Sequence, residues 1–428
     1  MRRFVPRTLV RPFKPKKRLR RRTIKTLARK RRAWNQYQWS QSSQDYVAYV
    51  ELRNLCNLQK KQDTSEHQRQ FLNRVIADPR SFYRDISMVT QAKPGITDIR
   101  RSDGSLTDGN QAAANTLAEY YSTVFSPELI SGVDENGLPA VDSIPSRLME
   151  PVSFSPAQVG LKLSSLVAKK SPGLDEIPPI LLQQCSEQLA LPLSKLFNHS
   201  MEVGVVPDEW KTCVVSPIFK SGDRTLPNNY RPVALLSVVS KVMEGLIDDK
   251  INEFVEQDRC LHDAQHGFRG KRSCQTNLIE TMEWYTCAAD RGVQLDVAML
   301  DFSKAFDRVR HSLLIEKLTN LGFPETMIAW ISNYLCDRTF RVRVNGVLSN
   351  RFGAPSGVPK GSILGPRLFT LFVSNLPVGI QSDLLMYADD IKICREIQSP
   401  LDKRTLQEDL DRLFTWSVAN GLPFNIDK

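Results

Sequence analysis

The stretch LLMYADDIKI at residues 384–393 sets two adjacent acids, Asp389 and Asp390, between two short apolar runs. Apolar residues precede the acids over residues 384–387 and alternate with a polar residue over residues 391–393. Runs of this length and alternation predict two strands, and the short segment between them predicts a tight turn. The sequence therefore places both carboxylates at the tip of a β-hairpin.

A second stretch, VAMLDF at residues 297–302, predicts a short buried strand that ends at Asp301. Ser303 is predicted to cap a helix that begins near Lys304, which would bring helix amides close to Asp301. Three carboxylates on neighbouring strands suit Mg²⁺, which prefers oxygen ligands. Without a cation, clustered carboxylates repel and one of them stays protonated. The three acids therefore predict a metal site that can serve phosphate chemistry.

An Asp-Asp pair in a turn is by itself more often a solvated turn former than a catalytic pair, so the interpretation depends on the surrounding motifs. Seven blocks follow one another along the chain: KSPGLDEIPP (170–179), PIFKSGDRTLPNNYRPVALLSVVSKVMEGLI (217–247), QHGFRGKRSCQTNL (265–278), LDFSKAFDRV (300–309), SGVPKGSILGP (356–366), YADD (387–390) and WSVANGLPFNIDK (416–428). In this order they resemble the reverse transcriptases of non-LTR retrotransposons, especially the jockey-like lineage. A weaker likeness extends upstream to about residue 31.

The resemblance implies an α+β right-hand polymerase fold, with fingers and an antiparallel palm sheet, a helical linker before them and the thumb missing. It implies RNA-directed DNA polymerisation, in which dNTPs are added to a primer 3′-hydroxyl with two Mg²⁺ ions, or Mn²⁺ as a substitute. The implied partners are an RNA template, a DNA primer and dNTPs. A catalytically silent, truncated remnant that only binds nucleic acid is the alternative, and a metal nuclease is a third interpretation.

Carried over residue by residue, the resemblance implies that Asp301 and Asp389 bridge the metal ions and that Asp390 assists them. Phe302 would offer its backbone carbonyl to one metal ion. Lys428 matches the position that protonates the pyrophosphate leaving group. Because Lys428 is also the last residue and no separate endonuclease precedes the polymerase, the sequence predicts a copy truncated at both ends.

The nucleotide-binding residues implied by the resemblance are Lys220, Arg231, Lys304, Ala305, Phe306, Lys360 and Gly361. Phe306 falls where the family places a ring beneath the incoming sugar, which implies deoxynucleotide selection, although alone it would be an ordinary core aromatic. Lys220 and Arg231 would otherwise be solvated hairpin charges. Lys360 departs from the family, where Gln is usual, and a Lys cannot accept a hydrogen bond. The implied template-contacting residues are Gly267, Phe268 and Arg269.

Positive charge is concentrated at the start of the chain. Residues 1–32 hold 16 of the 58 Lys and Arg residues and no acid, whereas the other 42 are outnumbered by 47 acids. Nucleic-acid binding, nuclear import, a mitochondrial transit peptide and a merely solvated tail all fit such a run. The predicted domains are a basic, disordered arm, a mainly helical linker, fingers and an incomplete palm, at residues 1–33, 34–150, 151–290 and 291–428.

Two local signals complete the prediction of the fold. Residues 213–236 predict two strands around a polar loop, and the dipeptide Asn345-Gly346 predicts a tight β-hairpin. The eight cysteines and five histidines lack metal-binding spacing, and no apolar run is long enough to cross a bilayer. The sequence therefore predicts an intracellular protein of the nucleus and cytoplasm, without a membrane partner and with its oligomeric state open.

Overall fold

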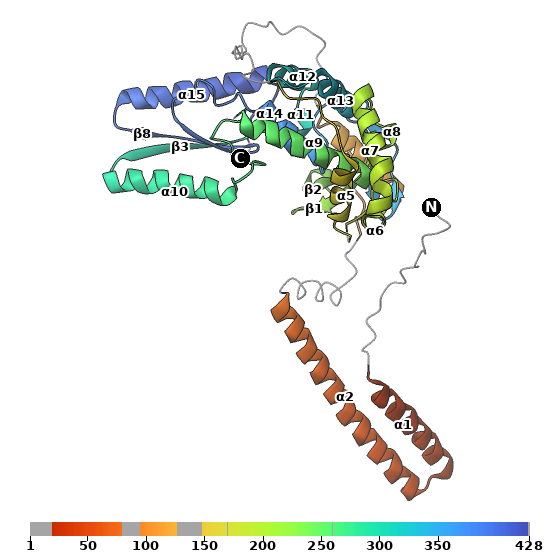
Figure 1. Ribbon diagram of the computed structural model, residues 1–428. Helices are drawn as coiled ribbons and strands as arrows, with labels where there is room; N and C mark the ends of the chain where they lie inside the picture. The colour runs from red at the N-terminus through yellow and green to blue at the C-terminus, as the bar shows by residue number, and fades with distance from the viewer. Residues whose placement is uncertain (1–18, 79–94, 126–147, 169, 259, 427–428) are drawn as a thin grey trace. The chain divides into compact units, whose positions relative to one another are not determined.

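The computed structural model contains two compact units, which divide the chain between Gly95 and Ile96 (Figure 1). The structure describes residues 19–78, 95–125, 148–168, 170–258 and 260–426. Within these ranges, no helix combines the length and the apolar character that a membrane crossing requires. The predicted role of Lys428 lies outside the described residues.

The first unit is a hairpin of two helices, α1 (Arg21–Ser40) and α2 (Ser43–Ala77), which pack along each other. Gln41, with a φ of 52°, makes the turn between them. Helix α1 thus begins inside the segment 1–33 that the sequence predicts to be a disordered arm. From Arg21 onward this segment is helical, because packing against α2 gives it a partner that its own charge pattern does not reveal.

A buried carboxylate holds the start of α1 against α2. Oδ2 of Asp63 accepts hydrogen bonds from the Thr23 hydroxyl at 2.7 Å and from the backbone N–H of Arg20 at 3.0 Å. The Thr23 bond, helped by the Arg20 amide and by the charges of Arg22 and Arg20, keeps the pKa of Asp63 below its usual range. Asp63 therefore stays ionised and binds the basic end of the hairpin.

The second unit contains a five-stranded and a three-stranded sheet, which confirms the predicted mixed α/β architecture. The larger sheet has the order β2-β1-β4-β5, with β6 paired to β4, and only its β1–β4 pair is parallel among the described strands. Its strands are β1 (Thr212–Phe219), β2 (Tyr230–Leu235), β4 (Thr339–Val344), β5 (Val347–Leu348) and β6 (Phe352–Gly353). Asn345 and Gly346 join β4 to β5 with φ angles of 49° and 90°, which confirms the hairpin prediction.

Helix α4 (Gly109–Ser122) covers one face of the larger sheet. Its buried side joins an apolar cluster that includes Ile99, Leu117, Tyr121, Phe340 and Val342. The Asn345 side chain also donates to the carbonyl of Ile96 at 3.0 Å. The segment from Ile96 to the end of α4 therefore belongs to the second unit, whereas the sequence predicts it within a linker over residues 34–150.

The smaller sheet is antiparallel and has the order β3-β8-β7. Its strands are β3 (Gln294–Asp301), β7 (Asp383–Tyr387) and β8 (Asp390–Ile397), close to where the sequence predicts them. The sheet lies between helix α15 (Pro400–Ala419) and helix α10 (Cys274–Arg291) (Figure 1). Ile391 and Ile393 are buried in the core on one face, and Lys392 points to α10 on the other. One face of the sheet is thus buried in the core, whereas the other carries Lys392 toward α10.

Helices pack around one large apolar core next to both sheets. They are α5 (Pro156–Ser164), α6 (Pro179–Gln184), α7 (Ser186–Val203), α8 (Asp208–Lys211), α9 (Val238–Gln257), α11 (Ala305–Arg308), α12 (His311–Asn320), α13 (Glu325–Leu335) and α14 (Leu364–Phe372). The largest fully buried side chains include Trp330 and Tyr334 of α13, whose rings stack at 5.2 Å, and Phe369 and Phe372 of α14. Helix α14 begins inside the SGVPKGSILGP block, and most of its residues are buried.

Lys317 of α12 is an ammonium group inside this core. Its Nζ donates to the Phe372 carbonyl at 2.6 Å, to Asn420 Oδ1 at 2.7 Å and to Asn375 Oδ1 at 3.0 Å. It also lies 4.3 Å from the centre of the Phe372 ring. Burial lowers the pKa of Lys317 to about 7. Lys317 therefore links α12, α14 and the end of α15 at the cost of desolvating a charge.

Replacement of Lys317 by Met should destabilise the second unit by about 1–3 kcal/mol, because three buried acceptors lose their donor. In the wild type the folded pKa of Lys317 is about 7, below the ordinary value near 10.5. The unfolded chain therefore binds more protons between these pH values, and stability rises with pH across that window. Urea unfolding at pH 7 and pH 9.5 should show a larger loss for Lys317→Met at pH 9.5. An equal loss at both pH values would contradict the lowered pKa.

Candidate active site

The turn between β7 and β8 carries two of the predicted acids. Tyr387 pairs with Asp390 across the turn, which leaves Ala388 and Asp389 at its tip. Ala388 has a φ of 58°, in the left-handed region that few residues other than glycine adopt at low cost. Its small side chain is buried, whereas Asp389 is half-buried and Asp390 is exposed. The backbone of the turn thus directs both acids away from the core.

Asp301 joins these acids through the register of the sheet. It is the last residue of β3 and lies opposite Asp390 of β8. Residues opposite each other in an antiparallel pair share a face, with Cβ atoms roughly 4.5–5.5 Å apart. Asp301 is half-buried there. The register therefore brings Asp301 and Asp390 together, with Asp389 next to them in the turn.

The donor chemistry of these acids fits a hard divalent cation. Mg²⁺ binds through one or two carboxylates and completes its coordination with water and phosphate oxygens. Among the described residues, however, no group of three or more His, Cys, Asp or Glu side chains is close enough to enclose a metal ion. The acids thus offer an open, carboxylate-lined edge rather than a closed protein cage.

The end of β3 is fixed by the segment after α15. The backbone N–H of Asn425 donates to the carbonyl of Asp301 at 2.7 Å, and Ser303 N–H donates to the carbonyl of Pro423 at 2.9 Å. The buried Phe302 ring stacks on Phe424 at 4.8 Å. Asp301 is therefore held on both sides, by β8 and by residues near the end of the chain.

The predicted helix cap at Ser303 is wrong. Lys304, with a φ of 57°, occupies the cap position of α11, and that helix is a single turn. Ser303 lies one residue before this cap position, and its backbone N–H donates to the segment after α15. Ala305 is buried, and the half-buried Phe306 ring stacks on Phe369 at 4.6 Å. The segment after Asp301 is thus shaped by ring packing rather than by a cap.

Cations gather around Asp307, in the segment that follows Asp301. Partial desolvation and then the charge of Lys360 lower the pKa of Lys304, while Asp307 opposes them and Lys220 and Arg308 add to the lowering. Lys220 and Lys304 still reach solvent. Lys220, Lys304, Arg308 and Lys360 therefore form one cluster of positive charge.

Lys360 is bound within this cluster. Its Nζ forms a hydrogen-bonded ion pair with Oδ2 of Asp307, whose side chain is 12% exposed. The pair borders a largely apolar cavity of about 100 Å³ beneath the larger sheet. Gly361 has a φ of 81°, and a Cβ there would lie 2.7 Å from the Ala234 carbonyl of β2. Only glycine lets this loop approach β2 so closely.

Arg231 lies elsewhere on the larger sheet. It is exposed on β2 opposite Ile218, and Lys220 follows the end of β1. The two strands and the loop between them confirm the predicted hairpin over residues 213–236. The structure does not link Arg231 to the cations around Asp307 among the described contacts.

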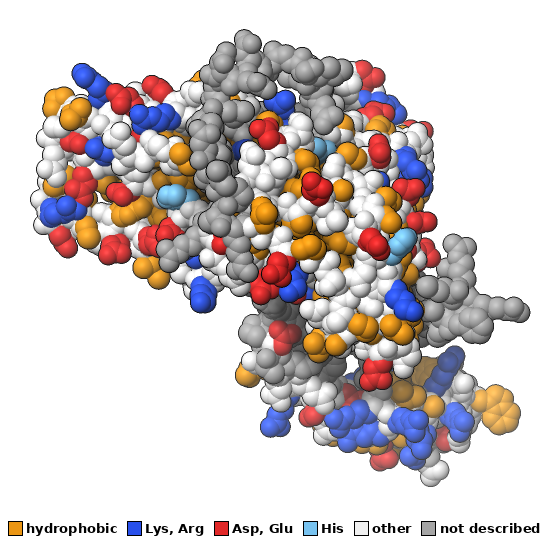
Figure 2. Space-filling model, turned by 45° about the horizontal axis from the view of Figure 1, so that its top comes forward, with side chains coloured by type: hydrophobic (Ala, Val, Ile, Leu, Met, Phe, Trp, Pro, Cys, Tyr) orange, Lys and Arg blue, Asp and Glu red, His pale blue; other side chains and the backbone are white. Residues whose placement is uncertain are grey.

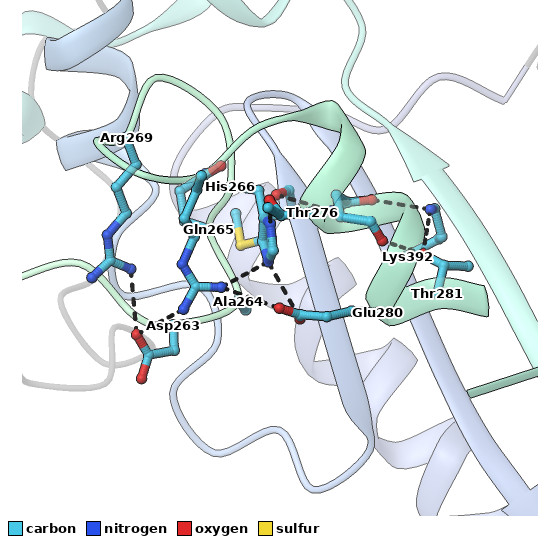
Figure 3. A network of polar contacts seen from close by, with 12 residues as sticks. Asp263, Ala264, Gln265, His266, Arg269, Thr276, Glu280, Thr281 and Lys392 are labelled. Atoms are coloured by element: carbon cyan, nitrogen blue, oxygen red, sulfur yellow. Dashed lines mark hydrogen bonds and ion pairs between the residues drawn. The ribbon is translucent and has the colours of Figure 1, made fainter. Parts of the chain in front are cut away.

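Of the three predicted template residues, Gly267 lies directly against the acidic turn. A Cβ at Gly267 would collide with the backbone N of Ala388. Phe268 is 45% exposed and meets Phe306 edge-on at 6.4 Å. The Arg269 guanidinium donates to the carbonyl of His262 at 3.1 Å and lies 3.4 Å from Glu256. It also lies 3.5 Å from Asp263 (Figure 3). Of the three, Phe268 offers the most surface to a ligand.

The sequence did not single out several residues that form hydrogen bonds around this site. They are Gln265, His266, Asn277, Asp307 and Lys392. Gln265, His266, Asn277 and Asp307 lie inside the quoted blocks, so the blocks themselves are a usable signal. Asn277 and Lys392 touch across 115 positions of sequence, and no local pattern predicts such a pair.

Residues 218–428 match the family model described as "Reverse transcriptase (RNA-dependent DNA polymerase)". A probable RNA-directed DNA polymerase from transposon BS of Drosophila melanogaster is 31% identical over 77% of this chain and 38% of that protein. The RNA-directed DNA polymerase from mobile element jockey of the same organism is 31% identical over 66% of this chain and 33% of that protein. The chain thus spans little more than a third of the length of these relatives.

Among solved structures, apo telomerase from Candida tropicalis, truncated from its C-terminal domain, aligns with a TM-score of 0.37 and 12% identity. The alignment covers 56% of this chain and 54% of the telomerase chain.

Replacement of Lys360 by Gln should destabilise the second unit by about 1–3 kcal/mol, because it leaves the Asp307 carboxylate without its ion partner. Asp307→Asn should cost a similar amount, and the double variant should cost less than the sum of the two. Urea unfolding of the four proteins gives this double-mutant cycle. Strictly additive losses would show that the two side chains are not coupled.

Proposed function

We propose that the chain extends a primer 3′-hydroxyl with dNTPs on an RNA template, because residues 218–428 match the reverse transcriptase family model and the chain is similar to polymerases of jockey and other non-LTR retrotransposons. The observation that carries the proposal is the pairing of Asp301 with Asp390, with Asp389 in the adjoining turn. These acids lie at an exposed edge, where a primer end and a triphosphate have access.

Two Mg²⁺ ions, or Mn²⁺ in their place, would be held by Asp301 and Asp389, with Asp390 and the backbone carbonyl of Phe302 assisting. When bound, such ions make the 3′-hydroxyl a better nucleophile and neutralise charge on the triphosphate. The protein residues fix the position of the acids: β8 and the Asn425 N–H hold Asp301 from two sides. The register thus supplies the preorganisation that phosphoryl transfer requires.

The cations around Asp307 would bind the triphosphate. Lys220 and Lys304 reach solvent and share one region of positive charge, which suits phosphate oxygens. Arg231 on β2 would join them when the loop between β1 and β2 folds over the nucleotide. Gly361 and Ala305 leave room for the nucleotide beside these charges.

Phe306 would select the sugar, and residues 267–269 would contact the template. The stacking of Phe306 on Phe369 fixes its ring, so a 2′-hydroxyl placed against it would meet a rigid wall. Phe268 offers an exposed aromatic face, on which a base can stack. Lys428 would donate a proton to pyrophosphate, a role that rests on its motif match alone.

Replacement of Asp389 by Asn should reduce Mg²⁺-dependent primer extension on an RNA template by about a hundredfold or more, because a metal ligand loses its charge. Asp390→Asn should have a smaller effect. Asp383→Asn is a matched control, because Asp383 begins the strand that ends at this turn. Extension measured with dNTPs that is unchanged by Asp389→Asn would disprove the metal assignment.

A protein that binds nucleic acid without extending a primer is the second candidate. The first unit favours binding independently of the acids: Arg20 to Arg32 include eight basic residues and no acid, and most reach solvent. Figure 2 shows Lys and Arg side chains gathered on the surface of this unit. Salt-sensitive RNA binding with no extension by the wild type would support this candidate.

Replacement of Lys25, Arg29 and Arg32 by Gln should weaken RNA binding. The slope of log affinity against log salt concentration should become shallower by roughly 0.7 for each lost phosphate contact. These three residues recur at helical spacing on α1 and are exposed. The control variant changes Arg53, Lys60 and Lys61 of α2 to Gln. Fluorescence anisotropy across a salt series should separate the two variants, and equal slopes would contradict a binding role for α1.

A further inference from the structure

A short segment before the template residues extends the smaller sheet. Gln265 forms a parallel bridge with Met386 at the outer edge of β7. The Met386 N–H donates to the carbonyl of Ala264 at 2.8 Å, and the His266 N–H donates to the carbonyl of Met386 at 2.9 Å. Residues 264–266 therefore run along the strand that leads into the acidic turn.

The side chain of Gln265 reaches the turn itself. It is 3% exposed, and its Oε1 accepts hydrogen bonds from Gly267 N–H at 2.8 Å and from Ala388 N–H at 3.1 Å. Because both partners are N–H donors, the atom that they contact must be the amide oxygen. Nε2 has no hydrogen-bond partner among the described residues. Gln265 is thus joined at once to the template segment and to the acidic turn.

The bond to Ala388 meets a need of the turn. The two central residues of a two-residue β-turn have no ladder partner for their N–H groups, and Ala388 is buried. Ala388 also has a positive φ, which must be stabilised by its surroundings. Gln265 supplies an acceptor for this N–H, while the close approach of Gly267 limits movement of the turn.

Buried polar contacts hold residues 264–266 in place (Figure 3). His266 is 1% exposed, and burial is the main cause that lowers its pKa, so its ring is neutral near pH 7. Its Nδ1 lies 2.8 Å from the Thr276 hydroxyl and its Nε2 lies 2.9 Å from Arg272. A neutral ring can donate from Nδ1 to Thr276 and accept at Nε2 from Arg272.

A second contact ties α10 to the same strands. Asn277 of α10 donates to the Met386 carbonyl at 3.4 Å, and Lys392 of β8 donates to Asn277 Oδ1 at 3.1 Å and to the Thr281 hydroxyl at 2.8 Å. The segment 264–266 is therefore anchored to α10 through His266, and α10 is anchored to β7 and β8. Gln265 lies at the centre of this anchored frame.

We infer that Gln265 is a positioning residue: it holds the Ala388–Asp389 turn and couples it to the template-contacting residues 267–269. The inference rests on the proposed function for its effect on catalysis, but not for its effect on the turn. Loss of the acceptor should leave all three acids present but make the orientation of the turn variable.

The first test measures hydrogen exchange at the Ala388 amide in the full chain, without nucleotide. Gln265→Met keeps the length of the side chain and removes the acceptor, and it should speed exchange at Ala388 by about tenfold or more. Gln265→Glu keeps an acceptor oxygen and should restore protection. The matched control, Gln294→Met at the start of β3, should leave Ala388 exchange unchanged. Unchanged exchange in Gln265→Met would overturn the inference.

The second test measures primer extension by the same proteins. Gln265→Met should lower kcat by about 10- to 100-fold while KM for dNTP and RNA affinity stay within about twofold. If the wild type extends primers and Gln265→Met has a normal kcat, the positioning role is overturned. No extension by the wild type, together with the expected exchange pattern, would instead refute the proposed function and support Gln265 as the brace of the turn. If Gln265→Met does not fold, Gln265→Asn, which is too short to reach Ala388, takes its place in both tests.

Discussion

The register between β3 and β8 is the constraint on which the candidate site depends. Asp301 lies opposite Asp390, and the neighbouring pair places Leu300 opposite Ile391. Because strand side chains alternate between faces, a slip of one residue would turn Ile391 out of the core and the acids toward it. Burial of the apolar face therefore fixes the acid face, and the core of the second unit sets the geometry of a site at its edge.

The charges around the acids are arranged so that a cation-rich region can persist beside them. Lys220, Lys304 and Lys360 would repel one another without a counter-charge, and the pKa of Lys304 is lowered partly for this reason. Asp307 lies among them and bonds Lys360. The acid thus stabilises the cluster from within while leaving Lys220 and Lys304 open to solvent. The chain thus keeps positive charge around Asp307 at a reduced cost in repulsion.

Local patterns in the sequence predict the strands of both sheets because alternation and the Asn345-Gly346 signal act over a few residues. The three acids could be singled out because they fall in motifs that resemble a known family. The helical start of α1 could not be predicted, since it depends on Asp63. The Ser303 cap prediction failed because the chain enters α11 one residue later, at Lys304 in the left-handed region. Likewise, Gln265 and Ala388 are 123 positions apart, so only the fold shows their bond.

The departure at Lys360 illustrates how one such contact changes the meaning of a residue. Seen alone, a Lys in place of Gln loses an acceptor and adds a charge. In the fold, the ammonium is bound to Asp307, so its charge is largely compensated and its direction is set by that partner. In the proposed function, the cations left to attract a triphosphate would then be Lys304 and Lys220, which reach solvent from two different segments. The substitution therefore shifts the cationic side of the site toward these residues rather than removing it, and Asp307 is the residue that makes this shift possible.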